Sequence, residues 1–237
     1  MKSKPVCEVG MEDYRKKILK TLDRFQYSRG RREVFLDVVE YVALTVATQF
    51  DPFKQEERNN RMQEIVANYK GTDGTTFCAL LTDMLSYLKK LPKSFGDYLG
   101  EMYMEIEAGN KNAGQYFTPY DISRLIAEVT ISEPSDKDKP ITLCEPCCGS
   151  GGMALAAAEV LQNYGFNYAD KLLVVANDID RHCVLMAYTQ LSFAAIPAII
   201  KWQDTLTQKT WDAFVTPAFA LQFDKFSRIY HGTESQM

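Results

Sequence analysis

The chain has 237 residues, a hydrophobic fraction of 46% and a formal net charge of -4 at pH 7. This composition is ordinary for a globular protein, so we do not expect an intrinsically disordered chain. No apolar run approaches the ~20 residues that cross a bilayer, so we expect no membrane partner. The acidic charge argues against a strongly basic nucleic-acid-binding surface over the whole chain, but a local basic patch stays compatible with it.

The first half of the chain has the apolar spacing of amphipathic helices and few strand signals. Ile18, Leu19, Leu22 and Phe25, for example, form one stripe. We therefore predict an N-terminal helical domain over residues 1–108. The predicted helices cover residues 14–25, 32–50, 54–70, 77–91 and 95–106.

From residue 109 onward, predicted strands and helices alternate. This alternation implies right-handed crossovers and a mostly parallel sheet, so we predict an α/β fold for residues 109–237. The predicted strands cover residues 141–146, 171–180, 198–206 and 211–215, and the predicted helices cover residues 119–130, 151–165 and 180–195.

A glycine cluster, "CGSGG", separates the first predicted strand from the helix that follows it. Glycines allow a turn with positive φ and let the backbone approach a ligand closely. In a parallel sheet, ligands bind beyond the carboxyl ends of the strands, where Asp178 also ends the next strand. An acid at that position is typical of sites that bind ribose hydroxyls. The pattern therefore predicts a cradle for a nucleoside.

The cysteines in the same segment allow another interpretation, a metal or redox site. Structural zinc needs a tetrahedral set of ligands. Cys144, Cys147 and Cys148 have no downstream C-x-x-C partner, and His182 and His231 show no paired spacing. We therefore predict no metal, whereas packing and a C-x-x-C redox role both stay open. The N-terminus lacks the apolar region of a secretory signal, and with six cysteines this predicts reduced thiols and a cytoplasmic location.

Four segments stand in an order that resembles a known family: "GQYFTP", "EPCCGSGGM", "NDID" and "KWQDTL". They are similar to the motifs of N6-adenine DNA methyltransferases, in particular the modification (M) subunit of type I restriction–modification systems. The resemblance covers roughly residues 90–216. It implies S-adenosylmethionine as the cofactor and a Rossmann-like methyltransferase sheet, which we expect to be incomplete in this chain.

The resemblance also implies roles for individual residues. The segment that starts at Tyr116 would pack near the methionine end of the cofactor, and Glu145 with the glycines would cradle its methionine side. Asp178 would accept the ribose hydroxyls, Ile179 would lie against the adenine, and Asp204 would bind the adenine amine or act only as a turn former. The implied cofactor-binding residues are Tyr116, Phe117, Thr118, Pro119, Glu145, Gly149, Gly151, Gly152, Asp178, Ile179 and Asp204.

The chain departs from the family at the segment where chemistry occurs. The family has N-P-P-F or N-P-P-Y there, and its Asn and Pro accept hydrogen bonds from the amine of a flipped adenine. This chain has Thr216, Pro217, Ala218 and Phe219 instead. A threonine hydroxyl does not replace an amide oxygen held in a rigid turn. We therefore expect a degenerate catalytic slot made of Thr216, Pro217 and Phe219, and little methyl transfer by the isolated chain.

Several functions are compatible with these observations. The first is a DNA adenine-N6 methyltransferase-like protein that binds S-adenosylmethionine. The alternatives are a non-catalytic cofactor- or DNA-binding regulatory protein and one half of a split enzyme. The partners that the resemblance implies are DNA and a specificity or restriction subunit.

Overall fold

The computed structural model describes residues 10–25, 29–91, 93–108, 116–134 and 139–234. Within the first 108 residues, the described part of the chain is helical. Two short 3-10 helices, Asp23–Phe25 and Pro52–Lys54, join longer elements. The longer helices are α1 (Met11–Leu22), α2 (Arg31–Ala47), α3 (Gln55–Ala67), α4 (Thr72–Leu88) and α5 (Tyr98–Glu107).

The second part of the chain forms a four-stranded sheet in the order β1-β2-β3-β4. Its first three strands are parallel: β1 (Ile141–Glu145), β2 (Leu172–Asp178) and β3 (Ala198–Gln203). Helix α7 (Gly152–Asn163) and the short α8 (Tyr168–Lys171) connect β1 to β2, and α9 (Arg181–Phe193) connects β2 to β3. Helix α6 (Tyr120–Thr130) precedes β1. The predicted α/β class, with a Rossmann-like parallel core after a helical segment, is confirmed.

Strand β4 (Thr210–Val215) forms where a fourth strand is predicted, but it runs antiparallel to β3. A tight turn joins the two strands as a hairpin, and Asp204 N–H donates to Lys209 O at 3.0 Å within it. The sheet is thus mostly parallel, as predicted, with an antiparallel strand at its β4 edge. Two further helices, α10 (Pro217–Leu221) and α11 (Phe223–Glu234), follow in a segment for which we predicted no element.

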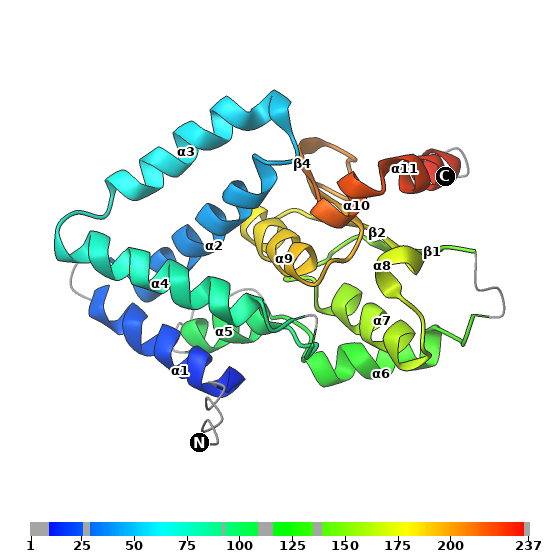
Figure 1. Cartoon of the computed structure of the whole chain (residues 1–237), viewed down its shortest axis with the longest axis horizontal. Coiled ribbons are helices and arrows are strands. Elements are labelled where there is room, and N and C mark those ends of the chain that lie inside the picture. The colour runs from blue at the N-terminus through cyan, green and yellow to red at the C-terminus, as the bar shows by residue number, and fades with distance from the viewer. Residues whose placement is uncertain (1–9, 26–28, 92, 109–115, 135–138, 235–237) are drawn as a thin grey trace, which may run out of the picture.

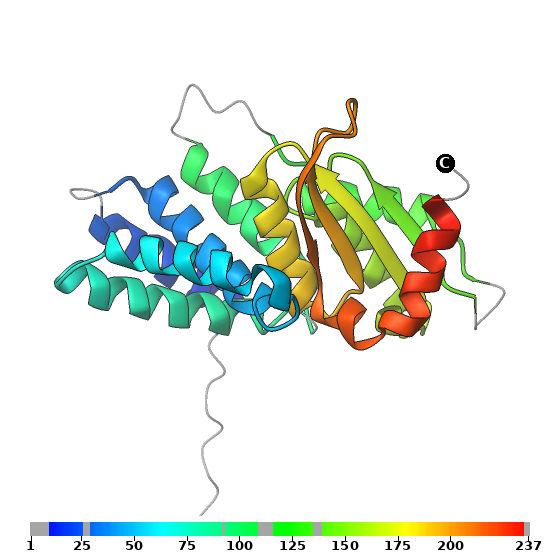
Figure 2. The same cartoon turned by 90° about the horizontal axis from the view of Figure 1, so that it is seen from above.

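Helices cover both faces of the sheet, because each central strand is apolar on both sides (Figure 2). Leu172, Val174 and Ala176 of β2 face the large core that α7 and α9 complete. Leu173 and Ile199 point to the other face and pack with Phe219 and Phe226 of α10 and α11. In β1 the alternate residues Thr142 and Cys144 are exposed.

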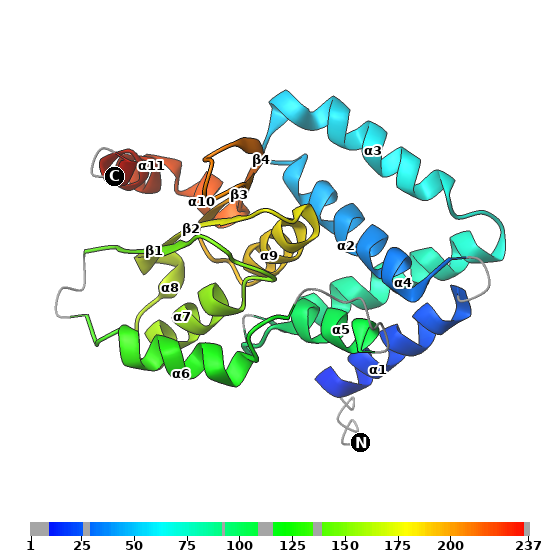
Figure 3. The ribbon, with the colours of Figure 1, turned by 180° about the vertical axis from the view of Figure 1, so that it is seen from behind.

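One hydrophobic core runs through both parts of the molecule. It extends from Ile18 of α1 to Phe214 of β4 without interruption. Figures 1 and 3 show why: α9 lies between the sheet and the N-terminal helices, and α2 packs along it. The helical part is therefore a wall of the α/β part. Within the described residues, no helix combines the length and apolar character that a membrane span requires.

Candidate cofactor site

The loop between β1 and α7 is shaped by two glycines with left-handed backbone. Gly149 has φ of +52° and Gly151 has φ of +96°, conformations that L side chains rarely adopt. A Cβ at Gly151 would also lie 3.2 Å from the Cα of Ala187 on α9. Cys148 N–H donates to Asn177 O at 2.9 Å and ties the loop to the end of β2. The glycine cluster is thus a tight strand-to-helix turn, as the sequence predicts.

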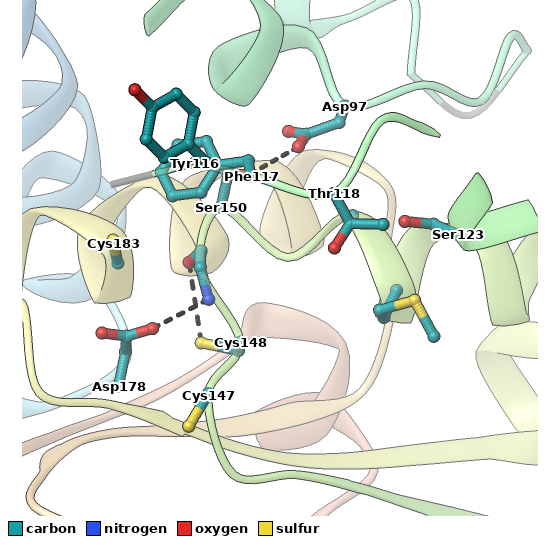
Figure 4. Close-up of a pocket in the computed structure, with 13 residues that line it drawn as sticks. Asp97, Tyr116, Phe117, Thr118, Ser123, Cys147, Cys148, Ser150, Asp178 and Cys183 are labelled. Atoms are coloured by element: carbon teal, nitrogen blue, oxygen red, sulfur yellow. Dashed lines mark hydrogen bonds between the residues drawn. The ribbon is translucent and has the colours of Figure 1, made fainter. Parts of the chain in front are cut away.

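Two carboxylates hold successive residues of this loop (Figure 4). Asp178, at the end of β2, accepts a hydrogen bond from Gly149 N–H at 2.9 Å through Oδ2. Asp97, which caps the start of α5, accepts a hydrogen bond from the Ser150 hydroxyl at 2.5 Å. The helical part of the chain and the sheet therefore both fix the loop.

A cavity of about 310 Å³ lies against this loop. It has the size of the smaller small-molecule sites in proteins. Side chains from the loop, from α9 and from the segment before α6 surround it. Its lining residues are Asp97, Tyr116, Phe117, Thr118, Ser123, Cys147, Cys148, Gly149, Ser150, Gly152, Met153, Asp178 and Cys183.

The structure brings six of the predicted cofactor residues together around the cavity. They are Tyr116, Phe117, Thr118, Gly149, Gly152 and Asp178. Phe117 lies so close to the loop that a Cβ at Gly149 would be 3.1 Å from its ring. Pro119 lines a neighbouring cavity on the α5 side instead. The predicted grouping of the "YFT" segment with the glycine turn therefore holds in space.

Four other predicted residues do not line the cavity: Glu145, Gly151, Ile179 and Asp204. Glu145 is half-buried at the end of β1, and burial, with a smaller contribution from the charge of Asp178, raises its pKa. The side chain of Ile179 is 64% exposed. Asp204 accepts hydrogen bonds from the N–H groups of Leu206 and Thr207. These bonds stabilise the turn that follows β3, which is the alternative role considered for Asp204, and its contact with the adenine amine stays a prediction.

The predicted catalytic slot lies at the opposite end of the sheet. Thr216 is fully buried; its hydroxyl donates to Ile196 O at 2.8 Å and accepts from Ala198 N–H at 2.9 Å. Ala198 begins β3, whereas the cavity lies where the parallel strands end. Pro217 starts α10 and Phe219 packs on Phe226.

The reason for this displacement is the β3–β4 hairpin, which turns the chain back before Thr216. The structure therefore does not bring Thr216, Pro217 and Phe219 to the cavity, and it corrects our expectation of a slot beside the cofactor.

The main residue that sequence reasoning missed is Asp97. Its only local signal is that of a helix N-cap, and its side chain accepts from Gly100 N–H at 3.0 Å in that role. The contacts to Ser150 and Gln190 join residues 53 and 93 positions apart in the sequence. Such contacts have no local sequence pattern.

Comparison with known proteins identifies the family of this chain. The fold and the site define a nucleoside-cofactor-binding protein of Rossmann-like type. A model of the N-6 DNA methylase family matches residues 94–228. Since this is more than half of the chain, the chain belongs to the N-6 DNA methylase family, as its motifs suggested. Asp97 lies within the matched residues, as does the whole sheet.

Individual relatives are more distant. The methylase subunit of the type I restriction enzyme MpnII from Mycoplasma pneumoniae is 26% identical over 193 residues, which are 76% of this chain and 34% of the relative. The methyltransferase subunit of a type I restriction–modification system from Streptococcus thermophilus has a solved structure. That structure is 13% identical, with a TM-score of 0.47, over 85% of this chain and 60% of that one. The chain spans about a third of the length of the Mycoplasma pneumoniae relative.

S-adenosylmethionine is the cofactor of this family, and the residues present fit it. Gly149 and Gly152 leave room that a Cβ would fill, beside Phe117 and Asp97 respectively. Asp178 places a carboxylate beside the loop, where ribose hydroxyls find an acceptor. When bound, the cofactor supplies an activated methyl group; the chain's own residues supply the cradle.

The cysteines give a first prediction. Burial raises the pKa of the Cys148 thiol well above its ordinary value and also raises that of Cys183, whereas Cys78, Cys144 and Cys147 are exposed. Because the thiolate is the reactive form, an alkylating reagent at pH 8 is expected to modify these three thiols before the other two cysteines that the structure describes. Cofactor at saturation is expected to slow modification of Cys147, which lines the cavity, and not that of Cys78.

Peptide mapping by mass spectrometry follows each thiol separately. Equal protection of Cys78 and Cys147 would contradict the location of the site. Within the described residues, no three potential ligands among His, Cys, Asp and Glu come together to hold a metal ion. The redox role of Cys144 and Cys147 stays a hypothesis.

Proposed function

We propose that this chain is a cytosolic protein of the DNA adenine-N6 methyltransferase type that binds S-adenosylmethionine. By itself, the chain binds the cofactor but does not complete methyl transfer. The observation that carries the proposal is the glycine loop. It is held by Asp178, bordered by Phe117 and open to a cavity at the carboxyl ends of the parallel strands. This arrangement is where nucleoside cofactors bind in α/β sheets.

Titration calorimetry with S-adenosylmethionine tests the proposal. We expect saturable binding, and we expect Asp178→Ala to weaken it by about 1.5–3 kcal/mol, which is the size of a hydrogen bond to a charged group. This is a loss of roughly 10- to 150-fold in affinity. The expected loss combines a ribose contact with the lost anchor of Gly149 N–H.

A control variant is Asp23→Ala. Asp23 is a half-exposed acid that pairs with Arg31 in the helical part, away from the residues that line the cavity. It should bind the cofactor like the parent chain. Heat indistinguishable from dilution for the parent chain, at concentrations that reveal micromolar binding, would refute the proposed function.

DNA is the substrate class that we propose for the complete system, and a specificity or restriction subunit is the proposed partner. Two findings support this: membership of the N-6 DNA methylase family, and similarity to a subunit of a type I restriction enzyme. Several arginines of the described helical part form ion pairs, for example Arg31 with Asp23 and Arg32 with Glu107. We therefore expect DNA contact to require the partner.

The position of Thr216 favours a second candidate, a non-catalytic regulatory protein that keeps the cofactor site. Its hydroxyl is buried in a helix cap at the far end of the sheet and has no access to the cavity. A split enzyme, in which another chain supplies the missing acceptors for the adenine amine, fits the same observation. The methyl-transfer experiment described below separates the two.

A further inference from the structure

Asp97 connects the helical part of the chain to the cofactor cavity. It lies just before α5, lines the cavity, and is only 3% exposed. Its carboxylate accepts hydrogen bonds from Gly100 N–H at 3.0 Å, from the Gln190 side-chain amide at 2.8 Å and from the Ser150 hydroxyl at 2.5 Å. These are all neutral donors.

The contacts of Gln190 fix this carboxylate in one orientation. The Gln190 amide also donates to Ser150 O at 2.7 Å, and its oxygen accepts from Leu99 N–H at 3.0 Å. The side chain of Asp97 is thus held between α5, α9 and the glycine loop. A Cβ at Gly152 would lie 3.2 Å from Asp97 Oδ2, so the start of α7 also borders the carboxylate closely. The network leaves Asp97 little freedom to turn away from the cavity.

The charged side chains that line the cavity are acidic. Asp97 and Asp178 are the acids among the lining residues, and no lysine, arginine or histidine of the described chain lines it. The two acids lie on different sides of the loop (Figure 4). Burial raises the pKa of Asp97, because the charged form loses its hydration, while the hydrogen bonds from Ser150, Gln190 and Gly100 partly oppose this effect. A cation in the cavity would favour the ionised carboxylate.

We propose that Asp97 supplies the negative charge by which this site distinguishes the sulfonium cofactor from its neutral thioether product. The proposal rests on the proposed function, since it assumes that the cavity binds S-adenosylmethionine. The two ligands share their nucleoside and amino-acid parts. They differ in one methyl group and one positive charge at sulfur, so a fixed carboxylate beside the sulfur acts on their difference. A carboxylate that paired with the ammonium group of the shared amino-acid part would attract both ligands equally.

The variant Asp97→Asn tests the charge alone. Asparagine has nearly the same shape, its oxygen can still accept from Gly100 and Gln190, and its NH₂ group can donate to the Ser150 hydroxyl, which rotates to accept. The matched control is Ser150→Ala, which removes one hydrogen bond of the network and keeps the carboxyl group of Asp97, which the bound cation holds in its ionised form.

Calorimetry then gives the Kd values of S-adenosylmethionine and S-adenosylhomocysteine for the parent chain and both variants. We expect Asp97→Asn to lower the preference for the sulfonium ligand, measured as the ratio of the two Kd values, by about tenfold. We expect Ser150→Ala to weaken both ligands by the same factor and to leave the ratio unchanged. If Asp97 had a purely structural role, Asp97→Asn would behave like Ser150→Ala: it would weaken both ligands by the same factor and leave the ratio unchanged.

Each other outcome decides a separate question. An unchanged ratio in Asp97→Asn overturns the inference and leaves the proposed function intact. If the parent chain binds neither ligand, the proposed function fails, and this inference fails with it. If circular dichroism shows that Asp97→Asn is unfolded, the parent chain is titrated with an analogue that carries an ammonium group in place of the sulfonium. Weaker binding of this cation than of the neutral thioether would then overturn the inference.

Discussion

Replacing Gly100 by alanine is expected to lower the free energy of unfolding by about 3 kcal/mol, near the upper end for single substitutions in a packed interior. A Cβ at Gly100 would lie 2.2 Å from Asp97 Oδ2 and 2.3 Å from Ser150 Oγ. Neither atom can move without breaking their mutual hydrogen bond, which is buried. The better helix propensity of alanine, about 1 kcal/mol, offsets only part of this cost.

Urea unfolding, followed by the fluorescence of Trp202 and Trp211, measures this loss. The matched control is Gly30→Ala, at the start of α2, where a Cβ would meet nothing within 4 Å and the backbone is extended. Its expected effect is below about 1 kcal/mol. If Gly100→Ala were no more destabilising than Gly30→Ala, the close approach of α5 to the glycine loop would be disproved.

The isolated chain is expected to transfer no methyl group to adenine in duplex DNA at a rate above background. The N-P-P sequence that would accept hydrogen bonds from the adenine amine does not occur in the chain. The segment in its place lies at the far end of the sheet, where Thr216 and Phe219 are buried and the Thr216 hydroxyl bonds to Ile196 and Ala198. Loss of even one preorganised group of this kind costs about 10²–10³ in rate.

Transfer of labelled methyl from the cofactor to mixed-sequence DNA measures this, with an active adenine methyltransferase as the positive control. The assay is run with the chain alone and with any co-encoded specificity subunit. Label in N6-methyladenine from the chain alone would contradict the expectation. Label that needs the partner would support a split enzyme, and its absence in both would favour the regulatory protein.

The cradle could be predicted from the sequence because its signals are local. Each signal needs only a few neighbouring residues. These signals are the glycines with positive φ, the helix that starts at Gly152 and the strand that ends in Asp178. The apolar periodicity likewise predicts the helices and the first three strands, since the period of the pattern follows from the geometry of each element.

The rest depended on contacts that the chain makes at long range. The pattern of "WDAFV" is the same for a parallel and an antiparallel strand, so nothing in it indicates the β3–β4 hairpin that removes Thr216 from the site. The role of Asp97 arises from α5 packing on the glycine loop. Helix α11 does have a local helical pattern that we did not include in our prediction, the apolar spacing of Phe223, Phe226 and Tyr230.

The uninterrupted core has a thermodynamic consequence for ligand binding. Because α2 packs along α9 and the same cluster of side chains continues into the sheet, we expect the described molecule to unfold as one cooperative unit. A ligand that binds only the folded state at a hundred times its Kd adds about 2.7 kcal/mol to the stability of that whole unit. Occupancy of the cradle would thus protect even the amide hydrogens of α1 from exchange, although α1 contributes no residue to the cavity lining.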